Sequence, residues 1–508
     1  MQQAMKHKAS DYFAVHGGTL RRESTGDKMW QLISKLDAIL GADFGMVKRH
    51  IISMEFVSEY LKRCGAEKAI LEGDFRRARK LVVDGKFTEA EMKTINEICR
   101  DLGEHAALVV RNSAFGDASG TGMLGNSFYS QNKDDVIAAY VKHVIASYYT
   151  EKAALFRKDA CIAEGLAVGI EPMVADEMKD EEGRKCLAPC ISGFGRTYSW
   201  YHGSPYLGAA YGLASEFVSN PKIGWIITEE HLLDMARFSR GGKAELLDFG
   251  DSHVDDMIFP LSQQKPMVFQ DGMAKKIDKR MYTVAAPIDV FRKMERLEAN
   301  CQGVIQHFEY ACTEGGKTFE IKINQITDII PKKMSDLSPA HGELLVSSDR
   351  VLGNGDVDSE WLVSVKTTEG WKHIREINEK YSKYVLIPEH ESIVRQGTDM
   401  LAAADCFVGM RRDSTKITIL KQLNYQDIHR MGALGVTSPS SMLSISNHFG
   451  GSLEATGKPV VLLNNVDYDL IAKNAKRIED RGSYAVYQIG TSVRASEFEQ
   501  KCEIRLRA

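Results

Sequence analysis

The sequence predicts an α/β (α+β) fold with a larger N-terminal unit and a smaller C-terminal unit. Apolar residues recur at helical spacing in several segments, and short apolar runs with strand character alternate with them. The stretch PKKMSDLSPAHG at 331–342 interrupts this pattern with Pro, Ser, Lys and Gly. We therefore expect one domain over 1–330, a linker over 331–342 and a second domain over 343–508.

The elements follow in order along the chain. Helical spacing of apolar residues predicts helices at 28–40, 53–64 and 134–156. Strands are predicted before the linker at 106–112, 166–174, 186–193, 303–311 and 319–326. After the linker, strands are predicted at 343–348, 360–366, 384–388, 432–438 and 458–465.

Composition excludes several classes of protein. The chain has 508 residues and a formal net charge of -4, so it carries no global basic field that would attract nucleic acid. No apolar run approaches the ~20 residues that span a bilayer, and the start lacks the apolar segment of a secretory signal. The nine cysteines form no CxxC pair. We expect a cytoplasmic protein with reduced thiols and no membrane partner; its oligomeric state is not predicted.

The segment VVRNSAFGDASGTGMLGNSFYS at 109–130 has the composition of a phosphate-binding loop. An apolar strand ends at Arg111, and small residues follow it, among them Ser113, Ser119, Gly120 and Thr121. Backbone N–H groups in such a loop can approach phosphate oxygens closely, and the hydroxyls and the guanidinium add donors. A surface loop has a similar composition, and the arginine at the strand end favours phosphate binding.

Two acids on successive predicted strands suggest a magnesium site. Glu309 lies in QHFEYA and Glu320 in FEIKINQI, and Asn324 and Gln325 follow closely. A hairpin with carboxylate and amide oxygens on one face suits Mg²⁺, which prefers oxygen ligands and shares them with nucleotide phosphates. An exposed polar strand face is the alternative interpretation.

His448 lies in SMLSISNHFGGSLEATGKPVVLL, where two glycines follow the imidazole shortly before an apolar strand. A histidine that a Gly-tolerant turn exposes at the edge of a core can act as a nucleophile or phosphoryl carrier. An ordinary loop histidine has the same surroundings, and the other two histidines near these motifs, His307 and His429, are interpreted as structural.

The order of these motifs resembles the phosphoenolpyruvate synthase and pyruvate phosphate dikinase family. VVRNSAFGDASGTG resembles the family's VRSSA segment and following loop, LAVGIEPMV its adenine-hinge strand, and ISGFGRTYSW its SGVxFTRxP loop. VIQHFEYA resembles the segment with the metal-binding glutamate, and TGDKMWQL the GGKxxxL opening. MGALGVTSPSSMLSISNHFGG resembles the swivelling phosphohistidine domain.

The resemblance implies a two-lobed ATP-grasp domain followed by a phosphohistidine-like domain, with ATP and Mg²⁺ as cofactors. It implies that Glu309 and Asn324 hold the metal, that Lys28 and Arg111 neutralise phosphate charge, and that His448 carries the phosphoryl group. Glu171 is expected near adenine and Arg196 over the phosphates. SRGGKAEL contains a second Gly-Gly-Lys at Lys243, and we favour Lys28 on the order of the motifs. The cofactor-binding residues predicted in full are Lys28, Arg111, Ser113, Ser119, Gly120, Thr121, Glu171 and Arg196.

Three departures from the family pattern matter. The metal-binding strand ends in INQITD without the family's arginine, and Asn447 precedes His448 where Ser or Cys is usual. The residues after His448 are too few for the (β/α)₈ barrel of ~250 residues that handles pyruvate in the full-length enzymes. We therefore do not expect the protein to make phosphoenolpyruvate by itself.

Three classes of function follow from these observations. The first is an ATP-dependent phosphotransferase that passes a phosphoryl group through His448 to an unidentified small-molecule acceptor and releases AMP and Pi. The second is an ATP-grasp ligase that activates a carboxylate or amide without the histidine. The third is a non-catalytic nucleotide-binding protein.

Overall fold

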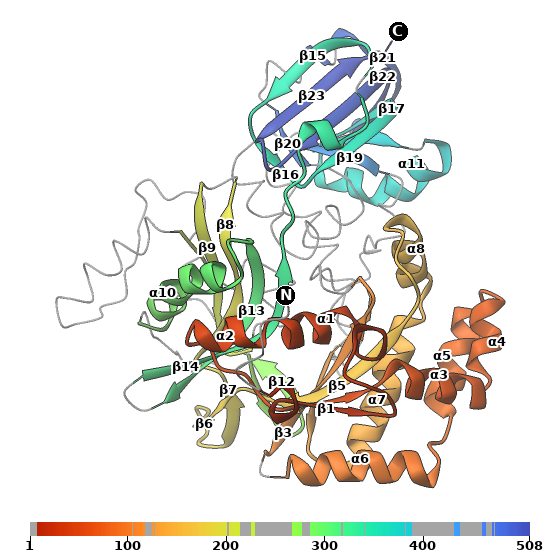
Figure 1. Cartoon of the computed structure of the whole chain (residues 1–508). Helices are drawn as coiled ribbons and strands as arrows, with labels where there is room; N and C mark the ends of the chain where they lie inside the picture. Colours follow the sequence, from red (N-terminus) through yellow and green to blue (C-terminus); the bar gives the residue numbers. More distant parts are fainter. Residues whose placement is uncertain are drawn as a thin grey trace.

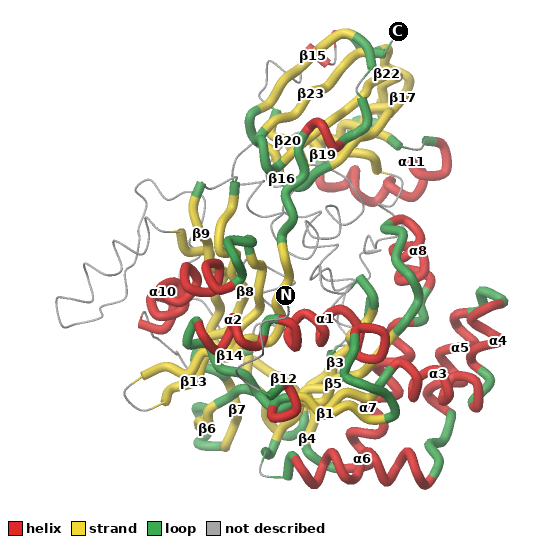
Figure 2. The backbone as a smooth tube through the Cα atoms, in the orientation of Figure 1, coloured by secondary structure: helices red, strands yellow, loops and turns green. Residues whose placement is uncertain are grey.

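The structure is a computed structural model, and the confirmed fold class is mixed α/β (Figure 1). It describes residues 8–103, 105–116, 124–125, 127–200, 203–213, 225–228, 267–276, 285–315, 318–339, 341–381, 383–388, 431–436, 460–463, 470–471 and 473–507. Within the described residues, three sheets are built from residues 13–328, here called the N-terminal unit, and a fourth from residues 343–506, here called the C-terminal unit. Figure 2 shows the helices gathered mainly around the first of these sheets.

The first sheet, sheet A, has the order β1-β2-β5-β3-β4. Its strands are β1 Phe13–His16, β2 Arg49–Ile52, β3 Ala107–Ala114, β4 Phe128–Gln131 and β5 Leu166–Pro172. The helices that alternate with these strands along the chain are α1 Arg22–Ser34, α2 Leu36–Gly41, α3 Met54–Arg63, α4 Ala66–Leu71, α5 Phe75–Asp84, α6 Glu89–Asp101, α7 Asp134–Tyr148 and α8 Glu151–Asp159. A 3-10 turn at Ala9–Asp11 precedes β1.

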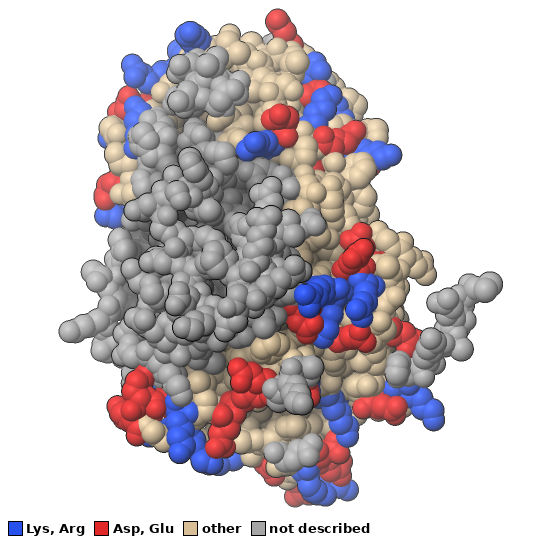
Figure 3. Space-filling view, turned by 90° about the vertical axis from the view of Figure 1, so that its left-hand side faces the viewer, with Lys and Arg blue, Asp and Glu red and all other residues tan. Residues whose placement is uncertain are grey.

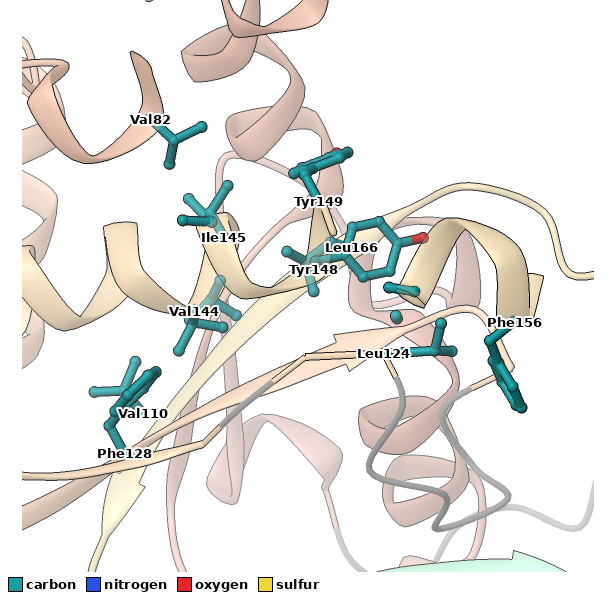
Figure 4. Close-up of a cluster of buried hydrophobic side chains, with 14 of the residues drawn as sticks. Val82, Val110, Leu124, Phe128, Val144, Ile145, Tyr148, Tyr149, Phe156 and Leu166 are labelled. Atoms are coloured by element: carbon teal, nitrogen blue, oxygen red, sulfur yellow. The ribbon is translucent and has the colours of Figure 1, made fainter. Parts of the chain in front are cut away.

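One face of sheet A packs on α7, and their side chains make a continuous apolar core (Figure 4). Val110 and Leu166 come from the sheet, and Val144, Ile145 and Tyr148 from α7. All five are at most 2% exposed. Burial of an aliphatic or aromatic side chain of this size stabilises the fold by roughly 1.5–3 kcal/mol, so this layer fixes the position of the sheet.

The second and third sheets complete the N-terminal unit. Sheet B has the order β10-β9-β8-β13-β14, with strands β8 Ile191–Ser199, β9 Ser204–Tyr211, β10 Trp225–Thr228, β13 Gln306–Gly315 and β14 Thr318–Asp328, and α10 Ala285–Asn300 packs on it. Sheet C has the order β12-β11-β7-β6, with strands β6 Asp176–Lys179, β7 Lys185–Ala188, β11 Met267–Gln270 and β12 Met273–Lys276.

A second apolar core lies between sheets A and B. It contains Ile51 and Ala167 from sheet A, Phe308 and Ile323 from sheet B, and Met29 from α1. At the same junction, Arg111 of sheet A lies 3.9 Å from Glu309 of sheet B.

The C-terminal unit is built around sheet D, whose order is β15-β23-β22-β17-β18-β19-β20-β16 with β21 on β22. Its strands are β15 Glu343–Ser348, β16 Val351–Leu352, β17 Gly355–Val365, β18 Tyr384–Pro388, β19 Met431–Val436, β20 Val460–Leu462, β21 Lys476–Asp480, β22 Tyr484–Ser496 and β23 Lys501–Leu506. The helical elements are α11 Ile374–Lys380 and 3-10 turns at Met334–Asp336 and Thr368–His373. β17, β18, β19 and β20 run parallel to one another.

Three predicted elements are divided in the structure. The helix predicted at 28–40 is the end of α1 followed by α2, because Lys35 between them leaves the helical conformation. The helix predicted at 134–156 is two helices, because Tyr149 leaves the helical conformation and the Thr150 side chain accepts a hydrogen bond from the Ala153 N–H at 3.1 Å, which starts α8. The strand predicted at 186–193 is β7 and β8, with Pro189 between them. Proline has no N–H for a sheet ladder, so a strand readily ends there.

The surface agrees with the balanced composition. Figure 3 shows acidic and basic side chains interspersed over the described part of one face. Within the described residues, no helix is long and apolar enough to cross a membrane.

Candidate functional site

Two arginines hold one glutamate on the inner face of sheet A. The Arg111 Nε donates to Glu171 Oε1 at 2.5 Å, and the Arg49 Nε donates to Glu171 Oε2. Arg49 is 0% exposed and Glu171 is 1% exposed. Glu171 therefore has both carboxylate oxygens occupied by arginines, and its predicted place near adenine stays a prediction.

The strand register explains this arrangement. Val109 of β3 pairs with Glu171 of β5, and Arg111 pairs with Gly169. Directly paired residues of antiparallel strands share a face, so Arg111 and Glu171 are diagonal neighbours. Gly169 matters here because a Cβ at this position would lie 2.3 Å from the Met29 Cε of α1.

The neighbouring charges shift the pKa values of Glu171 and Arg111. Burial by itself would raise the pKa of Glu171, but the charges of Arg111 and Arg49 outweigh it and hold that pKa below its ordinary value. Burial opposes the charge on Arg111, and the Glu171 and Glu309 carboxylates raise the pKa of the guanidinium. The mutual attraction thus favours the charged forms of Glu171 and Arg111, whereas burial lowers the pKa of Arg49.

The same arginines connect sheet A to sheet B. The Arg49 Nη2 donates to the Ile323 carbonyl of β14 at 3.0 Å, and the Arg111 Nη1 lies 3.9 Å from Glu309 Oε2 of β13. The side chains of Arg111 and Glu309 are 13% and 22% exposed, whereas those of Arg49 and Glu171 are 0% and 1% exposed. Within this chain of charges, the part that a ligand can reach is the Arg111–Glu309 end.

A β-bulge decides which amide faces Glu309. In the predicted β13–β14 hairpin, Tyr310 pairs with Ile323 but Glu309 pairs with Gln325, so Asn324 is an extra residue on β14. Gln325 therefore shares the face of Glu309, while Ile323 and Ile326 remain in the core between the sheets. Gln325 is the amide directly across from Glu309, whereas the predicted metal ligand Asn324 is half-buried at the bulge.

The donors near Glu309 fit a magnesium ion. One carboxylate with an amide oxygen beside it is a set of hard oxygen ligands, and Mg²⁺ characteristically takes its remaining ligands from water and phosphate. In the described ranges no three His, Cys, Asp or Glu side chains gather where they could hold a metal. The other predicted acid, Glu320, is exposed and lies 3.5 Å from the Lys322 Nζ.

The start of α1 approaches the end of β3. The Ser113 Oγ donates to the Thr25 carbonyl at 2.7 Å and accepts from the Met29 N–H at 3.1 Å. Asp27 accepts from the Gly116 N–H at 2.8 Å. These bonds place Lys28, which is 8% exposed, in the part of α1 that lies beside the strand that carries Arg111. Ser113 thus has a positioning role in the structure.

We expect Gly26→Ala to disrupt this approach. Gly26 has φ 74° inside α1, and a Cβ at Gly26 would lie 2.0 Å from the Ser113 carbonyl oxygen. The backbone conformation alone costs an alanine about 1–3 kcal/mol, and the overlap adds to that cost. Gly73→Ala is the matched control, because Gly73 has φ +75° with nothing within 4 Å. Urea unfolding should show a larger loss of unfolding free energy for Gly26→Ala than for Gly73→Ala. Equal losses would contradict the close approach of α1 to β3.

Arg196 of β8 contacts the C-terminal unit. Its Nη1 lies 2.9 Å from Glu497 Oε1, and the two side chains are 8% and 1% exposed. Its guanidinium also lies over the Trp200 ring, 5.3 Å from the centroid. The register pairs Arg196 with His307, two residues from Glu309 on β13, so Arg196 shares the face of Glu309. His307 itself packs against the Phe194 ring, in keeping with a structural role.

The structure thus brings together part of the predicted set. Arg111, Ser113, Glu309 and Lys28 lie at the junction of α1 with sheets A and B. Ser119, Gly120, Thr121, His448 and the alternative Lys243 lie outside the described residues. Sequence reasoning missed Arg49 and Glu497; a charged residue at the start of the apolar strand RHII was a signal for Arg49, whereas the sequence around Glu497 carries none.

The comparison with known families covers the centre of this site. Residues 52–232 match the family described as pyruvate phosphate dikinase, AMP/ATP-binding domain. Arg111, Glu171 and Arg196 lie inside the matched range, while Lys28 and Glu309 reach the site from outside it. No curated protein matches the chain. The two joined lobes fit an ATP-grasp-type domain, and residues 52–232 are similar to the AMP/ATP-binding domain of pyruvate phosphate dikinase, which supports a pyruvate phosphate dikinase and phosphoenolpyruvate synthase-like family.

Proposed function

We propose that the protein is an ATP-dependent phosphotransferase that passes a phosphoryl group from ATP through His448 to a small-molecule acceptor. ATP and one water would give AMP, Pi and a phosphohistidine, which then transfers its phosphoryl group to the acceptor. The observation that carries the proposal is the Arg111–Glu309 pair, a cation and a carboxylate brought within 3.9 Å from two different sheets. The match of residues 52–232 to an AMP/ATP-binding domain supports the nucleotide as ligand.

The accessible charges have distinct proposed roles. Arg111 and Lys28 stabilise negative charge that develops on the polyphosphate, because fixed cations in a partly buried site act without reorganising. Glu309 with the amide of Gln325 or Asn324 would hold Mg²⁺, which supplies further charge neutralisation on phosphate oxygens when bound. Ser119, Gly120 and Thr121 are proposed to donate to the phosphates.

The buried charges position the accessible ones. Glu171 holds the Arg111 Nε, so the remaining guanidinium nitrogens of Arg111 are directed by a fixed partner. Arg49 in turn holds Glu171 and bonds to β14, which links the position of Arg111 to the strand opposite Glu309. We therefore assign Glu171 a positioning role rather than a contact with adenine.

Intact-protein mass spectrometry after incubation with Mg·ATP tests the proposal. We expect a mass increase of one phosphoryl group that survives neutral quenching and is lost in acid, together with AMP in the supernatant. A His448→Ala variant that folds normally should show neither. Release of ADP and Pi without a phosphoprotein would favour the ligase, and retained ATP binding without turnover would favour the non-catalytic protein; either result would contradict the relay.

A further inference from the structure

The turn between β22 and β23 enters the N-terminal unit beside the proposed phosphate site. Glu497 lies in this turn and forms the 2.9 Å ion pair with Arg196 of β8. The neighbouring Phe498 meets the Trp200 ring edge-on, with centroids 5.4 Å apart. At this turn, one buried ion pair and one aromatic pair therefore link the two units.

Glu497 is held by the C-terminal unit before it meets Arg196. Its Oε2 accepts from the Gly353 N–H at 2.9 Å, and its own N–H donates to Asn354 Oδ1 at 3.0 Å. The carboxylate is thus preorganised by its own unit with one oxygen directed at Arg196. Any separation of the units removes Glu497 and Phe498 together.

The position of Arg196 connects this ion pair with the proposed phosphate site beside Glu309. Arg196 shares the face of Glu309 on the adjacent strand, and the offset of two residues corresponds to about 7 Å along the strand. A long arginine side chain spans this distance, so a polyphosphate bound beside Glu309 lies within its reach. In the present structure the charge of Arg196 is neutralised by Glu497 instead.

We propose that Glu497 competes with the nucleotide phosphates for Arg196, so that nucleotide binding and docking of the 497–500 turn oppose each other. This inference rests on the proposed nucleotide site. If Arg196 turns to a phosphate, the carboxylate of Glu497 stays buried without its cation, which is unfavourable until the turn leaves. By linkage, the factor by which bound nucleotide weakens docking of the turn is also the factor by which undocking strengthens nucleotide binding.

The linker permits such a separation. The Ile329 N–H donates to the Ile305 carbonyl of the N-terminal unit at 2.8 Å, whereas the Lys332 carbonyl accepts from the Ser496 Oγ of the C-terminal unit at 2.6 Å. Among the described contacts, Ile330 and Pro331 make no hydrogen bond to either unit. The covalent connection that has to bend is therefore two residues long, and one apolar cluster also contains residues of both units.

Binding of Mg·AMP-PNP to the full-length Glu497→Gln variant tests the competition. The amide keeps an acceptor for the Gly353 N–H but removes the charge that holds Arg196. We expect the Kd for Mg·AMP-PNP, measured by calorimetry, to fall at least about fivefold. Hydrogen exchange in the 497–500 turn should rise in the variant without nucleotide, and in the wild type when nucleotide is added.

Two further variants make the result specific. Glu503→Gln is the matched control, because it removes the same charge from a residue whose ion pairs among the described residues are with Lys501 and Arg505 of its own strand. It should leave the Kd unchanged. Phe498→Ala weakens docking at a half-buried position without altering charge, so it should also lower the Kd and serves if Glu497→Gln does not fold.

The outcomes separate the two proposals. Equal affinities in the wild type, Glu497→Gln and Phe498→Ala would overturn the competition and leave the nucleotide site intact. Weaker binding in both variants would also overturn it, because docking would then assist the nucleotide. Absence of binding in every form would overturn the proposed function, and the competition with it.

Discussion

Glu171→Ala is expected to lower the free energy of unfolding by about 3–5 kcal/mol, the cost of breaking a buried ion pair by removing one partner. The substitution leaves Arg49, which is 0% exposed, and Arg111, whose side chain is 13% exposed, without their shared carboxylate. Two like charges would then face each other near the core of the N-terminal unit. Urea unfolding followed by circular dichroism measures the loss.

Glu177→Ala provides the control for that measurement. Glu177 forms a 2.8 Å ion pair with Lys185, but the two side chains are 58% and 73% exposed. Exposed ion pairs contribute about 0–1 kcal/mol, so this variant should be nearly as stable as the wild type. Similar losses in both variants would show that the buried cluster is not a stabilising element.

The sign of the pH dependence follows from the lowered pKa of Glu171. A carboxyl whose pKa is lower in the folded state binds fewer protons there than in the unfolded chain. Its stabilising contribution is present above the unfolded value of about 4.3 and is lost as the pH falls through the lower folded value. Glu171→Gln should therefore lose stability relative to the wild type at neutral pH, with a smaller difference in acid.

Arg111→Ala is expected to reduce kcat/KM for Mg·ATP by about 100- to 1000-fold, a loss typical of removing one fixed group that stabilises transition-state charge. The rate of AMP formation, or of phosphoprotein formation in a single turnover, measures it. Glu171 keeps its bond to Arg49 in this variant, so the loss of stability should be smaller than for Glu171→Ala.

Arg184→Ala controls for the removal of a positive charge. Arg184 pairs with Asp180 in the turn between β6 and β7, and its side chain is 53% exposed. This variant should retain wild-type kcat/KM. If Arg111→Ala also retained it, Arg111 would be a structural residue and the phosphate assignment would be wrong.

Much of the fold was predictable because apolar periodicity is local. The spacing in SMEFVSEYLKRC predicted α3, and Ser53 caps it by accepting from the Phe56 N–H at 3.2 Å. Arg111 and Glu309 were also predicted, since each stands out in its strand. Their proximity was not predictable from spacing alone, because it depends on how two sheets pack across almost 200 residues of sequence.

The missed features depend on details that a sequence pattern does not contain. Regular alternation would have placed Asn324 on the polar face of β14, but the bulge shifts the register by one residue and presents Gln325 to Glu309. The Arg196–Glu497 pair joins residues some 300 positions apart in different units. Nothing in either local sequence specifies the other partner.

The bulged hairpin has a mechanical consequence. β14 continues from the bulge through Gln325 to its end at Asp328, and the next residue, Ile329, is the last one bonded to the N-terminal unit before the linker. Figure 1 shows β14 in the N-terminal unit. Strands resist stretching along their axis, so tension applied at Ile329 reaches Gln325 through the stiff backbone of β14. β14 thus both leads into the linker and pairs with the strand that carries Glu309. A force applied through the linker therefore displaces Gln325 relative to Glu309.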